Sequence, residues 1–491
     1  ESSEGVIPSN FNFPIITNLI IFANGLLLRK QIQRQNYNIV DKNPYHCIMK
    51  KLIFTLILSI SGLSCLAQPE VVLGDPFKSS GLDNIYDFDA QICTAAPKGY
   101  EAFYISHYGR HGSRYPYTAS VATALLDMLH EAGEKENLSE YGNGLMTRLE
   151  LFMEKAGNHI GELTDLGRQQ QYRLAGEMAE RYPQAFRKGA VVTAQASSSS
   201  RSILSMASFC TALARKCPSI RIDQFQGFAE TQATAPNMGR NPLRIKGPGL
   251  GNPYRESPAE FMQRRFPEFT ETVLGKMFRD PYAALGDRDV QYLMDHIYML
   301  IGGMNSLPDG VRMDFSDIAT PETLARMWEL DNYQRFCEYI VYTASCCSVF
   351  KDIIERADAR LALLDSAAGK HEGRAEGRAE GADLRFGHDH VLMSLLMIAD
   401  IDSFGELPEN PDELGHVFQT FRSPMAANLH FVFYRPKNGR GPILTGLSLN
   451  GQPARLSSLD KELGLSPDES GFYRWDDVKA WFEKRFSQLC D

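Results

Sequence analysis

FYISHYGRHGSRYP, residues 103–116, leads from an apolar segment into a loop where a histidine stands between two arginines. The imidazole of His111 can attack phosphorus and carry the phosphoryl group when nearby cations neutralise the phosphate oxygens. Arginine suits this task because its planar fork binds two oxygens and keeps its charge. The segment therefore predicts a strand that delivers a nucleophile between Arg110 and Arg114, with Gly112 letting the backbone approach the ligand. A surface loop with solvated arginines is the alternative.

Two further apolar runs end in polar clusters and are each followed by a helix-like pattern. Residues 190–194 lead through the serines 197–200 to Arg201, and residues 383–387 lead into the triplet 388–390. Parallel α/β sheets deliver their active-site loops in this way, and ligands bind outside the carboxyl ends of the strands. Helix N-termini at the same edge also favour anions. The pattern predicts an α/β fold in which all three polar clusters meet in one pocket.

The first motif resembles the Arg-His-Gly-x-Arg-x-Pro signature of the histidine acid phosphatases, the second branch of the histidine phosphatase superfamily. Phytases, acid phosphatases and multiple inositol polyphosphate phosphatases belong to this family. The pair His388-Asp389 resembles the second signature of its acid phosphatase and phytase members. Together with the pattern above, the resemblance implies a three-layer α/β/α core with a mostly parallel sheet and an inserted, mostly helical domain.

The resemblance assigns roles to six residues. It implies that His111 is the nucleophile and that Asp389 is the acid that protonates the leaving alcohol, because an alkoxide is a poor leaving group. The implied ligands of the phosphate are Arg110, Arg114, Arg201 and His388. For Arg201 the alternative is a residue at a helix N-terminus that makes only surface contacts.

The triplet His388-Asp389-His390 departs from the His-Ala-Glu of the inositol polyphosphate phosphatases and from the more common His-Asp-Thr. His390 is either a residue at the helix start, which we favour, or a substrate contact. Inositol polyphosphates such as phytate are the expected substrates by family analogy. The alternatives are a broad-specificity acid phosphatase acting on sugar phosphates or nucleotides and, more remotely, a non-catalytic phosphate-binding protein.

No cofactor or metal is expected, because the arginines neutralise the charge that magnesium neutralises in many phosphoryl-transfer enzymes. The nine cysteines contain no two Cys-x-x-Cys pairs, which argues against a structural zinc site, and their disulfide pairing stays open. A net charge of −9 and a pI near 5.8 argue against nucleic acid as a partner. No protein partner is evident, and the expected partner is a small phosphomonoester.

Residues 49–67 resemble a secretory signal peptide, with a charged start, an apolar core at 52–58 and a small-residue cleavage site at 65–67. We expect export to the periplasm or the medium, with Cys65 as an alternative lipid-attachment site. Residues 1–48 are expected to be an over-extended or non-functional leader. Their apolar part, residues 13–28, is short and interrupted, so no membrane span is expected.

The remaining chain is expected to form two core segments around an insertion. The expected boundaries are 68–224 for the first part of the α/β core, 225–370 for the helical domain, 371–382 for a flexible linker, and 383–491 for the second part of the core. The linker contains the repeated sequence Glu-Gly-Arg-Ala. With 43% hydrophobic residues, 491 residues suffice for two or three such units.

Several helices and a hairpin are predicted within these segments. The helical patterns cover 163–182 with Thr164 as N-cap, 202–214, 259–266, 289–300, 321–349, 391–398 and 475–486. Asn438-Gly439 predicts a hairpin between strands at 428–434 and 442–449. Residues 236–253 form a predicted loop whose Arg240, Arg244 and Lys246 either lie on the surface, which we favour, or line a polyphosphate pocket.

Overall fold

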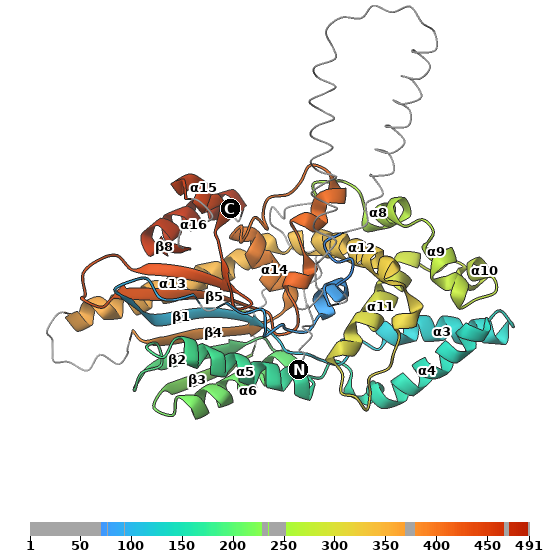
Figure 1. Ribbon diagram of the computed structural model, residues 1–491, viewed down its shortest axis with the longest axis horizontal. Helices are drawn as coiled ribbons and strands as arrows, with labels where there is room; N and C mark the ends of the chain where they lie inside the picture. Colours follow the sequence, from blue (N-terminus) through green and yellow to red (C-terminus); the bar gives the residue numbers. More distant parts are fainter. Residues whose placement is uncertain are drawn as a thin grey trace, which may run out of the picture. The chain divides into compact units, whose positions relative to one another are not determined.

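The computed structural model describes residues 70–75, 77–92, 94–227, 234, 252–368, 379–465 and 471–489 (Figure 1). Residues 68–491 form one compact unit. The predicted leader 1–48, the predicted signal peptide 49–67 with Cys65, the basic residues of the loop 236–253 and residues 371–378 of the predicted linker 371–382 lie outside the described residues.

A mixed sheet forms the centre of the unit, in the order β3-β2-β4-β1-β5-β6-β7 with β8 paired to β6. The strands around β4 are parallel, and those after β1 alternate in direction. Their bounds are β1 Tyr100–Arg110, β2 Val191–Ala196, β3 Arg221–Gln226, β4 Gly381–Gly387, β5 Asn428–Pro436, β6 Leu444–Leu449, β7 Gln452–Ala454 and β8 Phe472–Arg474. The three apolar runs thus form the predicted strands β1, β2 and β4, which are neighbours in the sheet.

Helices cover both faces of this sheet (Figure 1). On one face, α5 (Asp165–Arg181) and α6 (Ser200–Lys216) enclose a core to which β1 contributes Ile105. On the other face lie α13 (Thr343–Ala368), α14 (Asp389–Ile398) and α16 (Trp475–Leu489), with Tyr104 and Tyr108 of β1 in their core. Alternate residues of one strand therefore enter opposite cores, as a sheet buried on both faces requires. This confirms the three-layer α/β/α fold.

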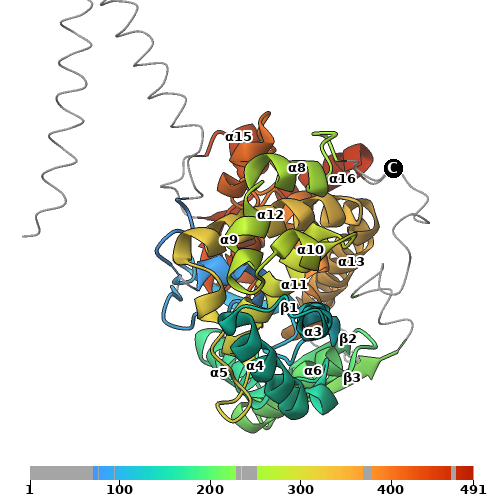
Figure 2. The same ribbon diagram turned by 90° about the vertical axis from the view of Figure 1, so that its right-hand side faces the viewer.

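A helical region closes the carboxyl-end edge of β1, and Figure 2 shows most of its helices in front of the strands. Helices of residues 258–340 form much of it: α8 Pro258–Arg265, α9 Phe269–Thr272, α10 Pro281–Leu285, α11 Val290–Gly303 and α12 Pro321–Ile340. The helices α3 (Ser120–Glu134) and α4 (Glu140–Ala156), which follow β1, also join it, because α3 packs on α11, α4 and α10. The helical region is thus assembled from two parts of the chain, and its core is continuous with that of the sheet.

The helix predicted at 321–349 is interrupted after Ile340. Val341 and Tyr342 form a turn between α12 and α13, where β-branched residues, Ile340, Val341 and Thr343, lower the helix propensity. Because of the break, the two helices lie in different parts of the molecule. Helix α13 covers the sheet, and α12 turns toward the edge where β1 and β4 end.

Other local predictions are confirmed. Thr164 caps α5, since its Oγ1 accepts a hydrogen bond from the Gly167 nitrogen at 3.2 Å. Gly439 has a φ of +69° in the turn between β5 and β6, which is the left-handed conformation that the Asn-Gly pair predicts. Helix α16 buries the predicted aromatic stripe of Trp475, Phe482 and Phe486 together with Val478.

The described cysteines are mostly reduced. Cys210, Cys217, Cys337 and Cys346 are free thiols, and Cys347 is disulfide-bonded.

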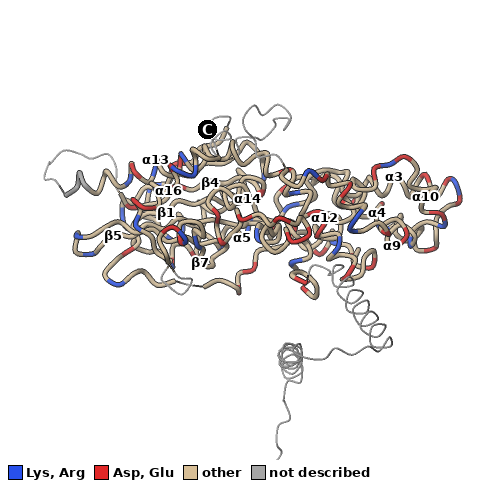
Figure 3. The backbone as a smooth tube through the Cα atoms, turned by 90° about the horizontal axis from the view of Figure 1, so that it is seen from above, with Lys and Arg blue, Asp and Glu red and all other residues tan. Residues whose placement is uncertain are grey.

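Acidic and basic residues are mixed along the described backbone (Figure 3). Within the described part of the chain, none of the helices is apolar and long enough for a membrane span.

Candidate active site

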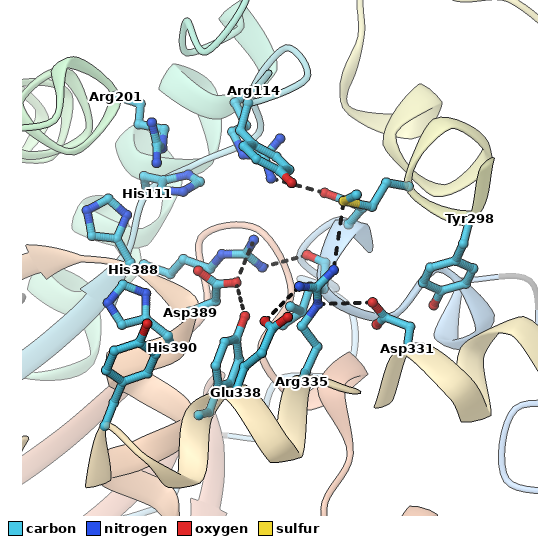
Figure 4. Close-up of a pocket in the computed structure, with 17 residues that line it drawn as sticks. His111, Arg114, Arg201, Tyr298, Asp331, Arg335, Glu338, His388, Asp389 and His390 are labelled. Atoms are coloured by element: carbon cyan, nitrogen blue, oxygen red, sulfur yellow. Dashed lines mark hydrogen bonds and ion pairs between the residues drawn. The ribbon is translucent and has the colours of Figure 1, made fainter. Parts of the chain in front are cut away.

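A pocket of about 380 Å³ opens where β1, β2 and β4 end, and helices α11 and α12 form its opposite side (Figure 4). All six residues with predicted roles line it. The full lining is Leu82, Asp83, Arg110, His111, Arg114, Tyr117, Arg201, Tyr298, Met299, Asp331, Arg335, Glu338, Tyr339, Tyr342, His388, Asp389 and His390. The structure therefore brings together the three polar clusters, as the strand pattern predicts.

The end of β1 holds His111 in one orientation. Its backbone nitrogen donates to Gly387 O at 3.1 Å, which ties the loop to β4. The ring Nδ1 lies 3.0 Å from Gly112 O. A carbonyl oxygen can only accept, so Nδ1 carries the proton and a neutral ring keeps its lone pair on Nε2.

The surroundings of His111 keep its ring neutral. Burial lowers the pKa of His111 well below its ordinary value, and the positive charges of Arg110 and Arg201 lower it further. An unprotonated imidazole nitrogen is the form that attacks phosphorus. The ring of His111 is thus in the unprotonated form that such an attack requires.

The structure shows a packing requirement for Gly112 that was not predicted from the sequence. A Cβ on Gly112 would lie 2.4 Å from the carbonyl oxygen of Gly167, at the start of α5. Next to it, Ser113 O accepts from the Thr164 hydroxyl at 3.0 Å, and Ser113 N donates to Gln170 at 2.8 Å. The glycine is required because two backbone segments pack directly on each other. The approach of the backbone to a ligand at Gly112 stays a prediction beside this packing on α5.

The guanidinium of Arg110 is fixed from behind. Its Nη1 donates to the carbonyl oxygens of Leu82 at 2.5 Å and Ser423 at 2.6 Å. Its side chain is 1% exposed, and Nη2 lies 3.8 Å from an oxygen of Asp389. These bonds aim the positive charge into the pocket without the mobility of a surface arginine.

Arg114 and Arg201 complete a cluster of positive charge beside His111 (Figure 4). Arg114 Nη2 lies 3.4 Å from Asp83, and Arg201 stands in the first turn of α6. Burial lowers the pKa of Arg201 to about 10, with the charge of Arg114 as the next cause, so the group stays charged at neutral pH. In the described part of the chain, the buried Nε atoms of Arg110, Arg114 and Arg201 have no hydrogen-bond partner. Buried donors of this kind suit an anion with several oxygens.

His388 and Asp389 stand where β4 passes into α14. His388 is the N-cap residue, and its Nε2 is 2.9 Å from the Ser197 hydroxyl. Burial lowers the pKa of His388 well below its ordinary value, as does the charge of its neighbours His390 and Arg201. The ring is therefore neutral and can donate one hydrogen bond to a ligand or to Ser197.

Asp389 is ionised while the pocket holds no anion. Burial acts to raise the pKa of Asp389, but Arg110 and the neighbouring histidines outweigh it and hold the pKa well below the ordinary value. Its Oδ2 also accepts a hydrogen bond from the Tyr339 hydroxyl at 2.9 Å. A bound phosphate would offset the arginine charge and raise this pKa, because a second negative charge disfavours the carboxylate. A proton on Asp389 is therefore expected only when a phosphate is bound.

The α12 side of the pocket was missed in the sequence. Tyr339 contacts Asp389, and Arg335 donates to Asp331 and Glu338 on the same helix. These residues recur at helical spacing, so a polar stripe on a largely buried helix is the pattern that would have indicated them. His390 packs on His388 with ring centroids 5.6 Å apart and also lines the pocket.

A comparison with known protein families agrees with the fold and with the residues of the pocket. Residues 109–246 match the histidine phosphatase superfamily (branch 2). The resemblance of the first motif to this family is thereby confirmed, and the match supports a phosphatase enzyme. No curated protein shows significant sequence similarity to the chain.

Solved structures share the fold. The multiple inositol polyphosphate phosphatase of Bifidobacterium longum, in complex with inositol hexasulfate, is 16% identical with a TM-score of 0.63, over 82% of this chain and 97% of that chain. The phytase from D. castellii is 13% identical with a TM-score of 0.57, over 84% of this chain and 86% of that chain. At these identities the likeness concerns the fold.

Proposed function

We propose that this chain hydrolyses phosphomonoesters through a covalent phosphohistidine at His111. The observation that carries the proposal is the buried, neutral His111, whose Nε2 is left free by the contact of Nδ1 with Gly112 O at 3.0 Å. The ring lies among Arg110, Arg114 and Arg201, which are arranged to neutralise one phosphate. This arrangement supports the proposal of a nucleophile held beside positive charges that neutralise the phosphate.

In the first step Nε2 of His111 attacks the phosphorus. An N–P bond forms with the lone pair of Nε2 while the bond between phosphorus and the ester oxygen breaks, and that electron pair stays on the oxygen. Asp389, protonated in the complex, gives its proton to this oxygen, so the leaving group departs as an alcohol. Arg110, Arg114, Arg201 and His388 hold the non-bridging oxygens throughout.

In the second step a water molecule takes the place of the alcohol. The carboxylate of Asp389 accepts a proton from the water as its oxygen bonds to phosphorus, and the N–P bond breaks with its electrons returning to Nε2. Inorganic phosphate leaves, His111 is neutral again, and Asp389 releases its proton to the solvent as the pocket empties and takes up another when the next phosphate binds. The proposed cycle uses no metal, since the guanidinium groups neutralise the phosphate, so a chelator should leave the rate unchanged.

His111→Ala tests the mechanism. We expect the variant to lose hydrolysis of p-nitrophenyl phosphate, and the wild-type enzyme, quenched with alkali during turnover, to carry a phosphate on His111 by mass spectrometry. His130→Ala is the matched control, because His130 is half exposed and pairs with Glu150 outside the pocket. Activity retained in His111→Ala, or a phosphate on another residue, would show that the mechanism is wrong.

Inositol polyphosphates such as phytate are the proposed substrate class. The support is the shared fold with structures named as inositol polyphosphate phosphatase and phytase. Monoesters of sugars or nucleosides are the second candidate, and the carboxylates on the α12 side favour it. A product-resolved assay with inositol hexakisphosphate beside simple monoesters decides between them, and an untouched hexakisphosphate would exclude the first.

We also propose that the enzyme is exported, on the charged and apolar pattern of residues 49–67. Fractionation of cells that express the full chain measures this directly. Activity confined to the cytosolic fraction would contradict it, and labelling of Cys65 by a lipid precursor would indicate the anchored form.

A further inference from the structure

The α12 side of the pocket contains a guanidinium that is shared among three carboxylates. Arg335 donates to Asp295 at 2.7 Å, to Asp331 at 3.0 Å and to Glu338 at 2.9 Å. Burial raises the pKa of Asp331 well above its ordinary value, and repulsion by Asp295 adds to this. Even if Asp331 is protonated, the four groups carry one more negative than positive charge.

Glu338 is the member of this group that a ligand reaches most easily. Its side chain is 42% exposed, whereas those of Asp295 and Asp331 are almost fully buried. One carboxylate oxygen accepts from Arg335 and the other from Gln334 at 3.0 Å. Each oxygen has a second lone pair, so Glu338 can still accept a hydrogen bond from a hydroxyl in the pocket.

Aromatic rings form the rest of this side. The hydroxyls of Tyr298 and Tyr339 are already bound, to Ser79 O at 2.8 Å and to Asp389 at 2.9 Å. What these tyrosines present to the pocket is therefore chiefly ring surface, with Met299 beside them. Such surface packs against the carbon face of a ring or chain and offers nothing to a second phosphate.

In the described lining of the pocket, the positive charge is concentrated around His111. Among the described residues that line the pocket, the guanidinium groups other than Arg335 are those of Arg110, Arg114 and Arg201, and they surround His111. They are committed to the phosphate that reacts. A neighbouring phosphate on the leaving group would bring about two further negative charges toward Glu338 and Asp83.

We infer that the α12 side is a leaving-group subsite that selects alcohols with free hydroxyls over alcohols with further phosphates, and that Glu338 determines this specificity. The inference rests on the proposed phosphatase reaction and, between its two candidate substrate classes, favours monoesters with free hydroxyls over phytate. The Glu338 carboxylate accepts hydrogen bonds from the hydroxyls of the leaving group and repels any further phosphates on it. One residue thus both favours the first kind of alcohol and disfavours the second. Among inositol phosphates, those with few phosphates are the preferred substrates.

The wild-type enzyme and Glu338→Gln test this with two substrates. We expect kcat/KM of the wild type for inositol monophosphate to exceed that for inositol hexakisphosphate by at least about tenfold. In Glu338→Gln the ratio should fall by roughly tenfold, mainly because KM for the hexakisphosphate falls. The ratio within one variant cancels any loss of folded enzyme, which a purely structural role would cause.

Glu322→Gln is the matched control, since Glu322 stands exposed in the first turn of the same helix. It should leave both values unchanged. A wild type that prefers the hexakisphosphate, or an unchanged ratio in Glu338→Gln, would overturn the inference. If Glu338→Gln does not fold, the wild-type enzyme is measured at two salt concentrations. The ratio of kcat/KM for the monophosphate to kcat/KM for the hexakisphosphate should fall at high salt, because salt screens the repulsion, and an unchanged ratio would overturn the inference.

Binding separates this inference from the reaction. Dissociation constants of both inositol phosphates for His111→Ala report the preference without turnover. If p-nitrophenyl phosphate is not hydrolysed by the wild type but the monophosphate binds more tightly, the proposed reaction fails and the subsite stands. If hydrolysis occurs and the hexakisphosphate binds more tightly, the subsite fails and the reaction stands.

Discussion

The sheet side of the pocket places three arginines around one histidine, whereas the α12 side divides one arginine among three carboxylates. On the sheet side, buried Nε atoms of the arginines lack partners among the described residues. On the α12 side, Arg335 meets its acceptors within the protein. The difference shows that a guanidinium lining a pocket is available to an anion only when its own fold leaves donors unpaired.

Removing a sheet-side arginine should have the largest effect. Arg201→Ala leaves the phosphate with fewer charge-assisted hydrogen bonds in the transition state, so kcat/KM should fall roughly a thousandfold for every monoester. Steady-state kinetics with two unrelated substrates measures it. Arg215→Ala, at the far end of α6, is the control. A loss below tenfold would mean that Arg201 does not bind the reacting phosphate, and would contradict the contrast between the arginines around His111 and Arg335.

Asp389→Asn should follow, with a dependence on the leaving group. The amide cannot give a proton to the ester oxygen, so hydrolysis of an alkyl phosphate should slow by about a hundredfold to ten-thousandfold. p-Nitrophenol is a better leaving group, and its ester should be affected much less. Comparing kcat for both esters in the same preparation checks this. Equal losses would mean that Asp389 holds the site together without donating a proton.

Tyr339→Phe should have the smallest effect and tests the contact between the two sides. The hydroxyl that donates to Asp389 at 2.9 Å stabilises the carboxylate, so its removal should raise the pKa of Asp389. The donor must be protonated, and the alkaline limb of the kcat profile should therefore move to higher pH. Tyr342→Phe is the neighbouring control. A shift to lower pH would contradict the assigned role of Tyr339.

The sheet side could be predicted from the sequence because its information is local. Each strand and its polar cluster are continuous in the chain, as in 383–387 followed by His388 and Asp389, and parallel strands must end at one edge. The packing of Gly112 on Gly167 could not be predicted, since Gly167 is distant in the sequence. A local motif indicates that a small residue is needed and does not name the second segment that packs there.

The α12 side could not be predicted in the same way. The sequence predicts one helix at 321–349. The slightly lower helix propensity of Val341 is too weak a signal to show that the helix ends there and that the chain changes direction. Tyr339 and Glu338 line the pocket from the last turn of α12, just before this break, where α12 packs on α14. The participation of α3 and α4 in the helical region likewise follows from packing on α11.

The contact between Gly112 and Gly167 bears on how such an enzyme can change. A Cβ on either glycine would overlap with backbone atoms of the other segment, so the spacing between the nucleophile's loop and α5 is fixed by main-chain atoms that no side-chain substitution can adjust. The α12 side is built from side chains, Glu338 among them. New substrate ranges are therefore open to point mutation on one helix, while the chemistry beside His111 is inherited unchanged.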